Sequence, residues 1–235
     1  MQPYFFPYIG YWQLIHAADR FVIYDDVNYI KGGWINRNRI LINGEPAYVT
    51  APLSQSSQYK RICDIALQSG TVWREKLVKM IGNTYRKAPW FDEVFPVIDR
   101  IIHNEAQNLA EYLAHQLRTF AVFMGIKTEF VVSSRCYENN SLVGQARILD
   151  ICKRESATTY INPQGGQALY DTDTFRDSSV DLRFIVMRTL TYKQRTAGFV
   201  PYLSIIDALM EVGPTEIQRH LDAFDLIAGE HVHAH

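Results

Sequence analysis

The chain has 235 residues, of which 47% are hydrophobic and 21% charged, and its formal net charge is −1 at pH 7. Such a chain can bury a substantial core and has the composition of a globular protein in water. Its nearly neutral charge excludes a global field that would attract nucleic acid or acidic membranes. No run approaches the roughly 18 to 20 apolar residues of a membrane-spanning helix, and the start lacks the basic segment of a signal peptide. We therefore expect a cytoplasmic protein with no nucleic-acid partner and no integral membrane segment.

The cysteines and histidines form no pattern typical of a metal site. Cys63, Cys136 and Cys152 have no paired spacing, which argues against both a zinc site and a disulfide framework. We expect all three to be reduced. Residues 231–235, HVHAH, are a weak candidate for metal binding, and a frayed chain end is the alternative. The sequence thus predicts no metal site and no cofactor.

The spacing of apolar residues and turn residues predicts short elements in the first half of the chain. Asn43-Gly44 is a typical two-residue hairpin turn, because both residues accept a positive φ. Pro89 and Pro96 are expected to bracket a short element, and Asn104 is expected to cap the longest helix. The predicted elements are a helix at 11–18, a strand at 21–27, strands near 38–42 and 47–51, a polar loop at 54–61, and helices at 73–87, 97–102 and 104–124.

The second half alternates strands and helices, and the order of strand 128–134, helix 141–156 and strand 158–163 is that of a parallel crossover unit. We expect one α/β domain over residues 1–227, with a mostly parallel sheet, an inserted antiparallel hairpin and an inserted helical segment. A flexible tail is expected at 228–235. The remaining predicted elements are a Gly-rich turn at 164–170 that leads into a short helix, a strand at 181–187, and helices at 201–213 and 214–224.

The opening segment MQPYFFPYIGYW places a proline-containing loop before the first predicted helix. In parallel α/β sheets, ligands bind at such loops, beyond the carboxyl ends of strands. A glycine here lets a ligand approach the backbone, and the helix start behind it favours a phosphate. The alternative is a hydrophobic N-terminal plug. The predicted substrate-binding residues are Gln2, Pro3, Tyr8, Gly10 and Tyr11, and the rings available to line a pocket are those of Tyr4, Phe5, Phe6, Tyr8, Tyr11 and Trp12.

Two carboxylates end the strand predicted at 21–27. Asp25 and Asp26 lie where a carboxylate can orient an amine, ligate magnesium or accept a proton. We predict that both are catalytic and that Tyr24 beside them contacts the substrate. The alternative is an acidic turn in solvent.

A cationic stretch, KGGWINRNR, follows over residues 31–39. Alternation along a strand places Asn36 and Asn38 on one face and Arg37 and Arg39 on the other. Two arginines on one face can hold a diphosphate through paired hydrogen bonds. The alternative is a surface strand in solvent. The predicted substrate-binding residues of this stretch are Lys31, Trp34, Asn36, Arg37 and Arg39.

A third candidate patch, TYINPQGGQALY, covers residues 159–170. It again places glycines between a strand and a helix, and its amides offer neutral hydrogen bonds that suit sugar hydroxyls. We predict that Asn162, Gly165 and Gly166 bind substrate. The patch lacks the spacing of a dinucleotide fingerprint or a P-loop.

The stretch MQPYFFPYIGYWQLIHAADRFVIYDDVNYIKGGWINRNRI resembles the opening of the WbqC-like family, and SLVGQARILDICK, TYINPQGGQALY and FVPYLSIIDALM resemble its later blocks. The resemblance covers residues 1–227. Members are often encoded in gene clusters for O-antigen and other surface polysaccharides. The resemblance implies the tailoring of amino sugars, for example by aminoacyl transfer of the glycyl type to a sugar amine. Members commonly carry a few apolar residues before M-Q-P, so the first strand is expected to be a stub unless the true start lies upstream.

The order strand, P-x-x-x-P-x-x-G-x, helix, Ala-Asp, strand is similar in layout to the nucleotidylyltransferase superfamily with an H-x-G-H loop. This similarity implies a Rossmann-like sheet. In that superfamily histidines hold the nucleotide phosphates, whereas Tyr8-Ile9-Gly10-Tyr11 stands in their place here. Tyrosine is neutral at pH 7 and offers no imidazolium charge, so the layout alone does not imply adenylation chemistry.

These features together predict a transferase that modifies a nucleotide-linked or lipid-linked amino sugar. Two alternatives stay open, namely a non-catalytic binding or assembly subunit and an ATP-dependent ligase. ATP and magnesium are expected only for the ligase. A homodimer is compatible with the sequence.

Overall fold

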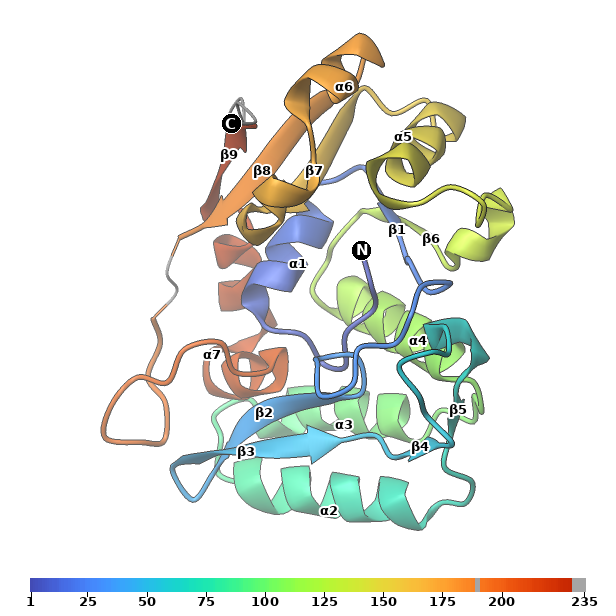
Figure 1. The fold of residues 1–235 in the computed structure, drawn as a ribbon. Helices are drawn as coiled ribbons and strands as arrows, with labels where there is room; N and C mark the ends of the chain where they lie inside the picture. Colours follow the sequence, from blue (N-terminus) through green and yellow to red (C-terminus); the bar gives the residue numbers. More distant parts are fainter. Residues whose placement is uncertain (189–190, 230–235) are drawn as a thin grey trace.

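The computed structural model describes residues 1–188 and 191–229, and Figure 1 shows how its elements are arranged. Within these residues no helix is long and apolar enough to cross a membrane. In chain order the elements are α1 (Ile9–His16), β1 (Arg20–Val22), β2 (Arg37–Ile42), β3 (Glu45–Thr50), β4 (Leu53–Ser54), the 3-10 helix η1 (Ile62–Asp64), β5 (Ala66–Leu67), α2 (Val72–Tyr85), α3 (Phe91–Ile102), α4 (Leu109–Phe123), β6 (Glu129–Val131), η2 (Ser134–Tyr137), α5 (Gly144–Arg154), β7 (Thr159–Pro163), η3 (Gln164–Leu169), α6 (Thr172–Asp177), β8 (Asp181–Met187), α7 (Ile205–His220) and β9 (Phe224–Ala228).

The fold is mixed α/β, with parallel and antiparallel strand pairs in separate small sheets. β1 pairs in parallel with β6, and β7 pairs in parallel with β8, whose other neighbour β9 runs antiparallel. Met1 lies alongside β1, because its amine donates to Val22 O at 2.8 Å and its carbonyl accepts from Tyr24 N at 2.9 Å. These two bonds tie Met1 to β1 and the residue pair after it.

The predicted crossover over residues 128–163 is wrong in its pairing. β6 and β7 lie in different sheets, since β6 pairs with β1 and β7 pairs with β8. α1 packs against β7 and β8, beside the separate β1–β6 pair (Figure 1). Local periodicity identified both strands, but a strand's neighbour is set by long-range packing that the pattern does not contain.

The inserted hairpin is confirmed. β2 pairs antiparallel with β3, and the connecting residues Asn43 and Gly44 both have positive φ, at 54° and 83°. Asn38 is only 2% exposed and faces inward, whereas Arg37 and Arg39 lie on the other, half-exposed face. The predicted alternation of this strand is therefore correct.

The inserted helical segment differs from expectation at two places. α4 begins at Leu109, because Asn108 caps it by accepting hydrogen bonds from Ala110 N at 2.9 Å and Glu111 N at 3.3 Å. Asn104 instead accepts from Ala106 N within the preceding loop. Pro96 does not bracket a helix but lies inside α3, where the buried apolar face of the helix compensates for the one lost backbone hydrogen bond.

α7 bends at Gly213, whose φ of 80° and ψ of 168° leave the helical region. A Cβ at this position would lie 2.4 Å from the Trp90 ring, so only glycine fits. The expected break between helices 201–213 and 214–224 is confirmed, although β9 replaces the end of the second helix. Residues 230–235, which include most of the predicted tail, lie outside the described residues.

The backbone of residues 2–8, here called the opening loop, is fixed by three buried side chains. Asn38 Nδ2 donates to Phe5 O at 3.1 Å and Phe6 O at 2.9 Å, and Ser204 Oγ donates to Phe6 O at 2.8 Å. Gln116 accepts from Phe6 N at 3.1 Å and donates to Tyr4 O at 3.0 Å. These bonds hold Phe6 at a φ of 42°, a region that a bulky residue rarely adopts.

The rings of the opening segment divide into two groups. Phe5, Phe6 and Trp12 are 0% exposed and Tyr11 is 2% exposed, so these four rings belong to the main hydrophobic core. Only Tyr4 and Tyr8 are half-buried. The expectation that all these rings are available to line a pocket is therefore too broad, because most of their area is used in folding.

We predict that Asn38→Ala lowers the free energy of unfolding by about 1–3 kcal/mol, because it removes a donor from two buried carbonyls. Urea unfolding followed by circular dichroism measures this loss. The exposed Asn28 is the matched control, and Asn28→Ala should change stability by less than about 0.5 kcal/mol. Equal effects of the two substitutions would contradict the role given to Asn38.

Candidate functional site

The loop that follows β1 approaches the loop that follows β7. Tyr24, just after β1, lies under the Arg147 guanidinium of α5 at 4.8 Å from its ring centroid. Tyr24 also lies within electrostatic range of Tyr170, which follows η3. The carboxyl ends of β1 and β7 therefore contribute to one region, although the two strands belong to different sheets.

Asp25 ties β1 to the segment after β6. Its carboxylate accepts from Ser133 Oγ at 2.9 Å and from Ser134 N at 3.0 Å, and it is 1% exposed. Its carbonyl accepts from Cys63 N at 2.9 Å. Every polar group of Asp25 thus has a protein partner, which is the condition for burying a carboxylate at low cost.

Asp26 forms a buried ion pair with Arg147, with Nη2 and Oδ2 2.6 Å apart and side chains 0% and 5% exposed. Ser134 Oγ donates to the same carboxylate. Arg147 also donates to Asn139 Oδ1 and to Asn140 Oδ1, each at 2.8 Å. Both charged groups therefore have partners of opposite charge or hydrogen-bonding partners. Removing either Asp26 or Arg147 would leave the other buried with an unpaired charge.

The predicted catalytic role of Asp25 and Asp26 is not supported by this geometry. A general base must reach the proton that it removes, and both carboxylates are enclosed by protein donors. The assignment stays a prediction. In this structure, the two residues hold Arg147 and the segment after β6 in place.

Arg147 is the functional candidate that the sequence reasoning did not include. The sequence contained an indication that Arg147 is buried. It lies four residues before the apolar Ile151, on the inward face of a predicted amphipathic helix. A charged residue on such a face needs a buried partner of opposite charge.

Four half-buried tyrosines, here called the tyrosine rim, form two pairs, in which Tyr4 interacts electrostatically with Tyr8 and Tyr24 with Tyr170. The opening loop supplies Tyr4 and Tyr8, β1 leads to Tyr24, and η3 leads to Tyr170. Burial raises the pKa of each, so all four are neutral phenols at pH 7 that can donate and accept hydrogen bonds. Tyr8 also packs edge-to-face with the exposed Tyr202, at 5.9 Å between ring centroids.

The other predicted residues of the opening segment have structural partners. Gln2 O accepts from Tyr11 Oη at 2.7 Å, and Pro3 is buried. A Cβ on Gly10 would lie 1.4 Å from Met187 Sδ, so the packing of α1 against the end of β8 already requires glycine there. A ligand is therefore not needed to explain Gly10.

The third predicted patch lies next to the tyrosine rim. Asn162 is 8% exposed and donates to Tyr160 Oη at 3.3 Å, and the Tyr160 and Tyr170 hydroxyls lie 3.0 Å apart. Gly166 packs against the Asn162 amide, whereas a Cβ on Gly165 would meet nothing within 4 Å. Gly165 is thus the open position of this patch.

The predicted hairpin residues make contacts within the hairpin and the loop before it. Arg37 stacks on Tyr48 at 4.4 Å and Arg39 faces Trp34 at 5.8 Å, while Lys31 is exposed. Asn36 is buried and bonded to Tyr29 Oη and Ala51 O, which is a structural arrangement. Within residues 1–188 and 191–229, the cation that pairs with the acidic residues is Arg147, not Arg37 or Arg39.

The three cysteines are not paired with one another in the described structure. Cys63, Cys136 and Cys152 are free thiols, and burial raises the pKa of Cys63 and Cys152 to about 11. Among the described residues, no group of three or more metal-ligating side chains occurs.

The structure therefore defines a mixed α/β protein in which Tyr24 lies against the buried ion pair of Asp26 and Arg147. The chain belongs to the WbqC-like protein family, whose family profile matches residues 2–219. It is 28% identical over 216 residues to the "Uncharacterized protein Rv1507c" of Mycobacterium tuberculosis (strain ATCC 25618 / H37Rv), which covers 91% of this chain and 92% of the relative. No solved structure gives a significant match, so the predicted nucleotidylyltransferase-like layout stays a prediction.

We predict that Arg147→Met lowers the free energy of unfolding by about 3–5 kcal/mol, because it leaves Asp26 charged and buried without its partner. Arg154 on the same helix is the matched control, since its side chain is about half exposed and its ion pair with Asp150 is in contact with solvent. Arg154→Met should cost less than about 1 kcal/mol. Chemical denaturation of both variants measures the difference, and similar small losses would show that the Asp26–Arg147 pair contributes little.

Proposed function

We propose that the protein is a transferase that modifies a nucleotide-linked amino sugar, by aminoacyl or acyl transfer to the sugar amine, in surface-polysaccharide biosynthesis. The observation that supports the proposal is the tyrosine rim, which supplies neutral, half-buried phenols from the opening loop, the segment after β1 and the segment after η3. Aromatic faces with hydroxyl groups suit sugars, which present both apolar C–H faces and hydroxyls. Membership of the WbqC-like family supports the same context.

In this proposal, Tyr8, Tyr24 and Tyr170 contact the sugar, and the open backbone at Gly165 lies beside it. The hairpin arginines, Arg37 and Arg39, are assigned to the diphosphate. During transfer, the amine nitrogen forms an amide bond with the donor carbonyl, the bond to the leaving group breaks, and the amine proton leaves with that group. We assign the acidic pair to positioning rather than to proton transfer, because Asp25 and Asp26 are enclosed.

A second function, a non-catalytic binding or assembly subunit, is favoured by that same enclosure. The tyrosine rim would then bind the sugar nucleotide without turnover. A third candidate function is an ATP-dependent ligase. It differs from the other two because it forms a modified sugar only when ATP and magnesium are present. The three functions share the ligand but differ in what happens to it.

The first experiment measures binding. A uridine diphosphate-linked 4-amino sugar is titrated into the protein and followed by isothermal titration calorimetry. We expect Tyr8→Ala and Tyr24→Ala to weaken binding by about tenfold each, because each removes a ring face and a hydrogen bond. Tyr59 is 83% exposed on a different loop, so Tyr59→Ala should bind like the wild type.

Mass spectrometry of the same sugar nucleotide then separates the three functions. Incubation with an activated acyl donor such as acetyl-coenzyme A should add one acyl unit if the protein is a transferase. A product from free glycine that needs ATP and magnesium would identify a ligase. Binding without any product supports the subunit, and absence of binding to the wild type overturns the proposal.

A further inference from the structure

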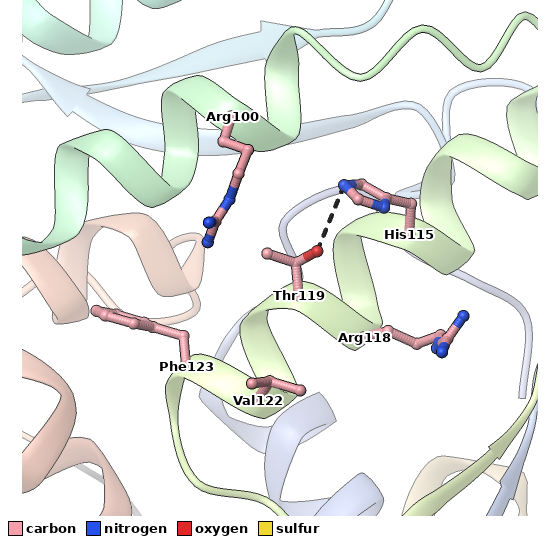
Figure 2. A pocket seen from close by; sticks show the side chains of 6 residues that line it. All are labelled: Arg100, His115, Arg118, Thr119, Val122 and Phe123. Carbon is pink, nitrogen blue, oxygen red and sulfur yellow. Dashed lines mark hydrogen bonds between the residues drawn. The ribbon is translucent and has the colours of Figure 1, made fainter.

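A groove on the far face of α4 is not used by the proposed site. It has a volume of about 540 Å³ and lies between α3 and α4 (Figure 2). The α4 residues that line it recur at positions i, i+3, i+4 and i+7, so they form one stripe of the helix. The lining residues are Arg100 of α3 and His115, Arg118, Thr119, Val122 and Phe123 of α4.

The groove has three basic side chains in its lining and no acidic one. Figure 2 shows Arg100 reaching from α3 toward Thr119, whereas Arg118 extends along α4 away from Arg100. Among the residues that the structure describes, neither arginine has an ion-pair or hydrogen-bond partner, although Arg20, Arg147 and Arg188 are paired with carboxylates. Positive charge is therefore uncompensated at this place in a chain whose net charge is near zero.

The pKa of His115 is affected by this excess of positive charge. Burial lowers the pKa of His115, and the charges of Arg100 and Arg118 lower it further. Its Nε2 shares a hydrogen bond of 3.4 Å with Thr119 Oγ1. An anion in the groove would relieve the repulsion and favour the protonated imidazole.

The groove also has an apolar part. Val122 is 80% exposed and Phe123 is half-buried next to it. The volume is within the range of about 300–1,000 Å³ that small-molecule sites occupy. A ligand that carries both an anion and an apolar or aromatic group would match both parts of the lining.

We propose that this groove binds a soluble phosphate ester, with its phosphate between Arg100 and His115 and its apolar or aromatic group over Val122 and Phe123. Guanidinium groups bind phosphate oxygens through charge-assisted hydrogen bonds, and Arg118 adds charge from the edge of the groove. This site is separate from the tyrosine rim, so it does not depend on the function proposed above.

Phenyl phosphate is the probe, because it joins a phosphate to one aromatic ring, and inorganic phosphate at matched ionic strength is its comparison. We expect phenyl phosphate to shift the NMR signals of the His115 ring and raise its pKa. We expect it to bind about tenfold more tightly than inorganic phosphate, because the ring covers apolar surface. Val122→Ser should reduce this preference without changing the affinity for inorganic phosphate.

Arg100→Gln and Arg118→Gln should each weaken phenyl phosphate binding, by about tenfold for Arg100. Arg86, exposed at the end of α2 and outside the groove, is the matched control, and Arg86→Gln should bind normally. Thermal unfolding confirms that each variant is folded, and all are surface changes of small expected cost.

Several results would overturn the proposal. They are an unchanged His115 signal at saturating probe, equal affinity for inorganic phosphate, or the same loss in Arg86→Gln. A His115 response only to vesicles that contain phosphatidylglycerol would assign the surface to a membrane instead. The sugar-nucleotide titration tests Tyr8 and Tyr24, whereas the phenyl phosphate titration tests residues of the groove. Either proposal can therefore fail without affecting the other.

Discussion

The hydrogen bonds from Asn38, Gln116 and Ser204 to the opening loop determine how the rest of the structure is arranged. They come from β2, α4 and α7, three elements far apart in the chain, and each ends on the same short backbone around Phe6. The buried carbonyls and N–H of the loop would otherwise have no partner, because the loop makes no regular ladder. The hairpin, the helical segment and the C-terminal helix are therefore placed relative to one another by the loop that they enclose.

The second organising contact is the Asp26–Arg147 pair. It connects the end of β1 to α5 across a sequence separation of 121 residues. The Tyr24 ring lies against the Arg147 guanidinium, so the ion pair also fixes the position of Tyr24. A buried ion pair adds little net stability compared with apolar packing, but it fixes geometry, because charged groups tolerate few alternative arrangements. Here that geometry holds α5 against the end of β1.

Local rules predicted much of this fold. Asn43-Gly44 makes the expected hairpin, since its conformation depends on only two residues. Asn104 and Asn108 are both good capping residues, and only the pairing of the preceding loop with β5 decides that Asn108 caps α4. The candidate site was harder, because the position of the acidic pair in a buried network depends on Arg147, which is distant in sequence. The pairing of β6 with β1 and of β7 with β8 was missed for the same reason.

The left-handed conformation of Phe6 has a kinetic consequence. Its N–H is bonded to a buried amide, and its conformational entropy is lost when the chain folds, before any ligand arrives. In the proposed function, a ligand beside Tyr8 would meet a backbone that these bonds already hold, and would need only rotation of tyrosine side chains, which takes nanoseconds rather than the microseconds to milliseconds of loop closure. Association is thus limited by diffusion and orientation, at about 10⁵–10⁷ M⁻¹s⁻¹ for a partner of protein size and faster for a small molecule.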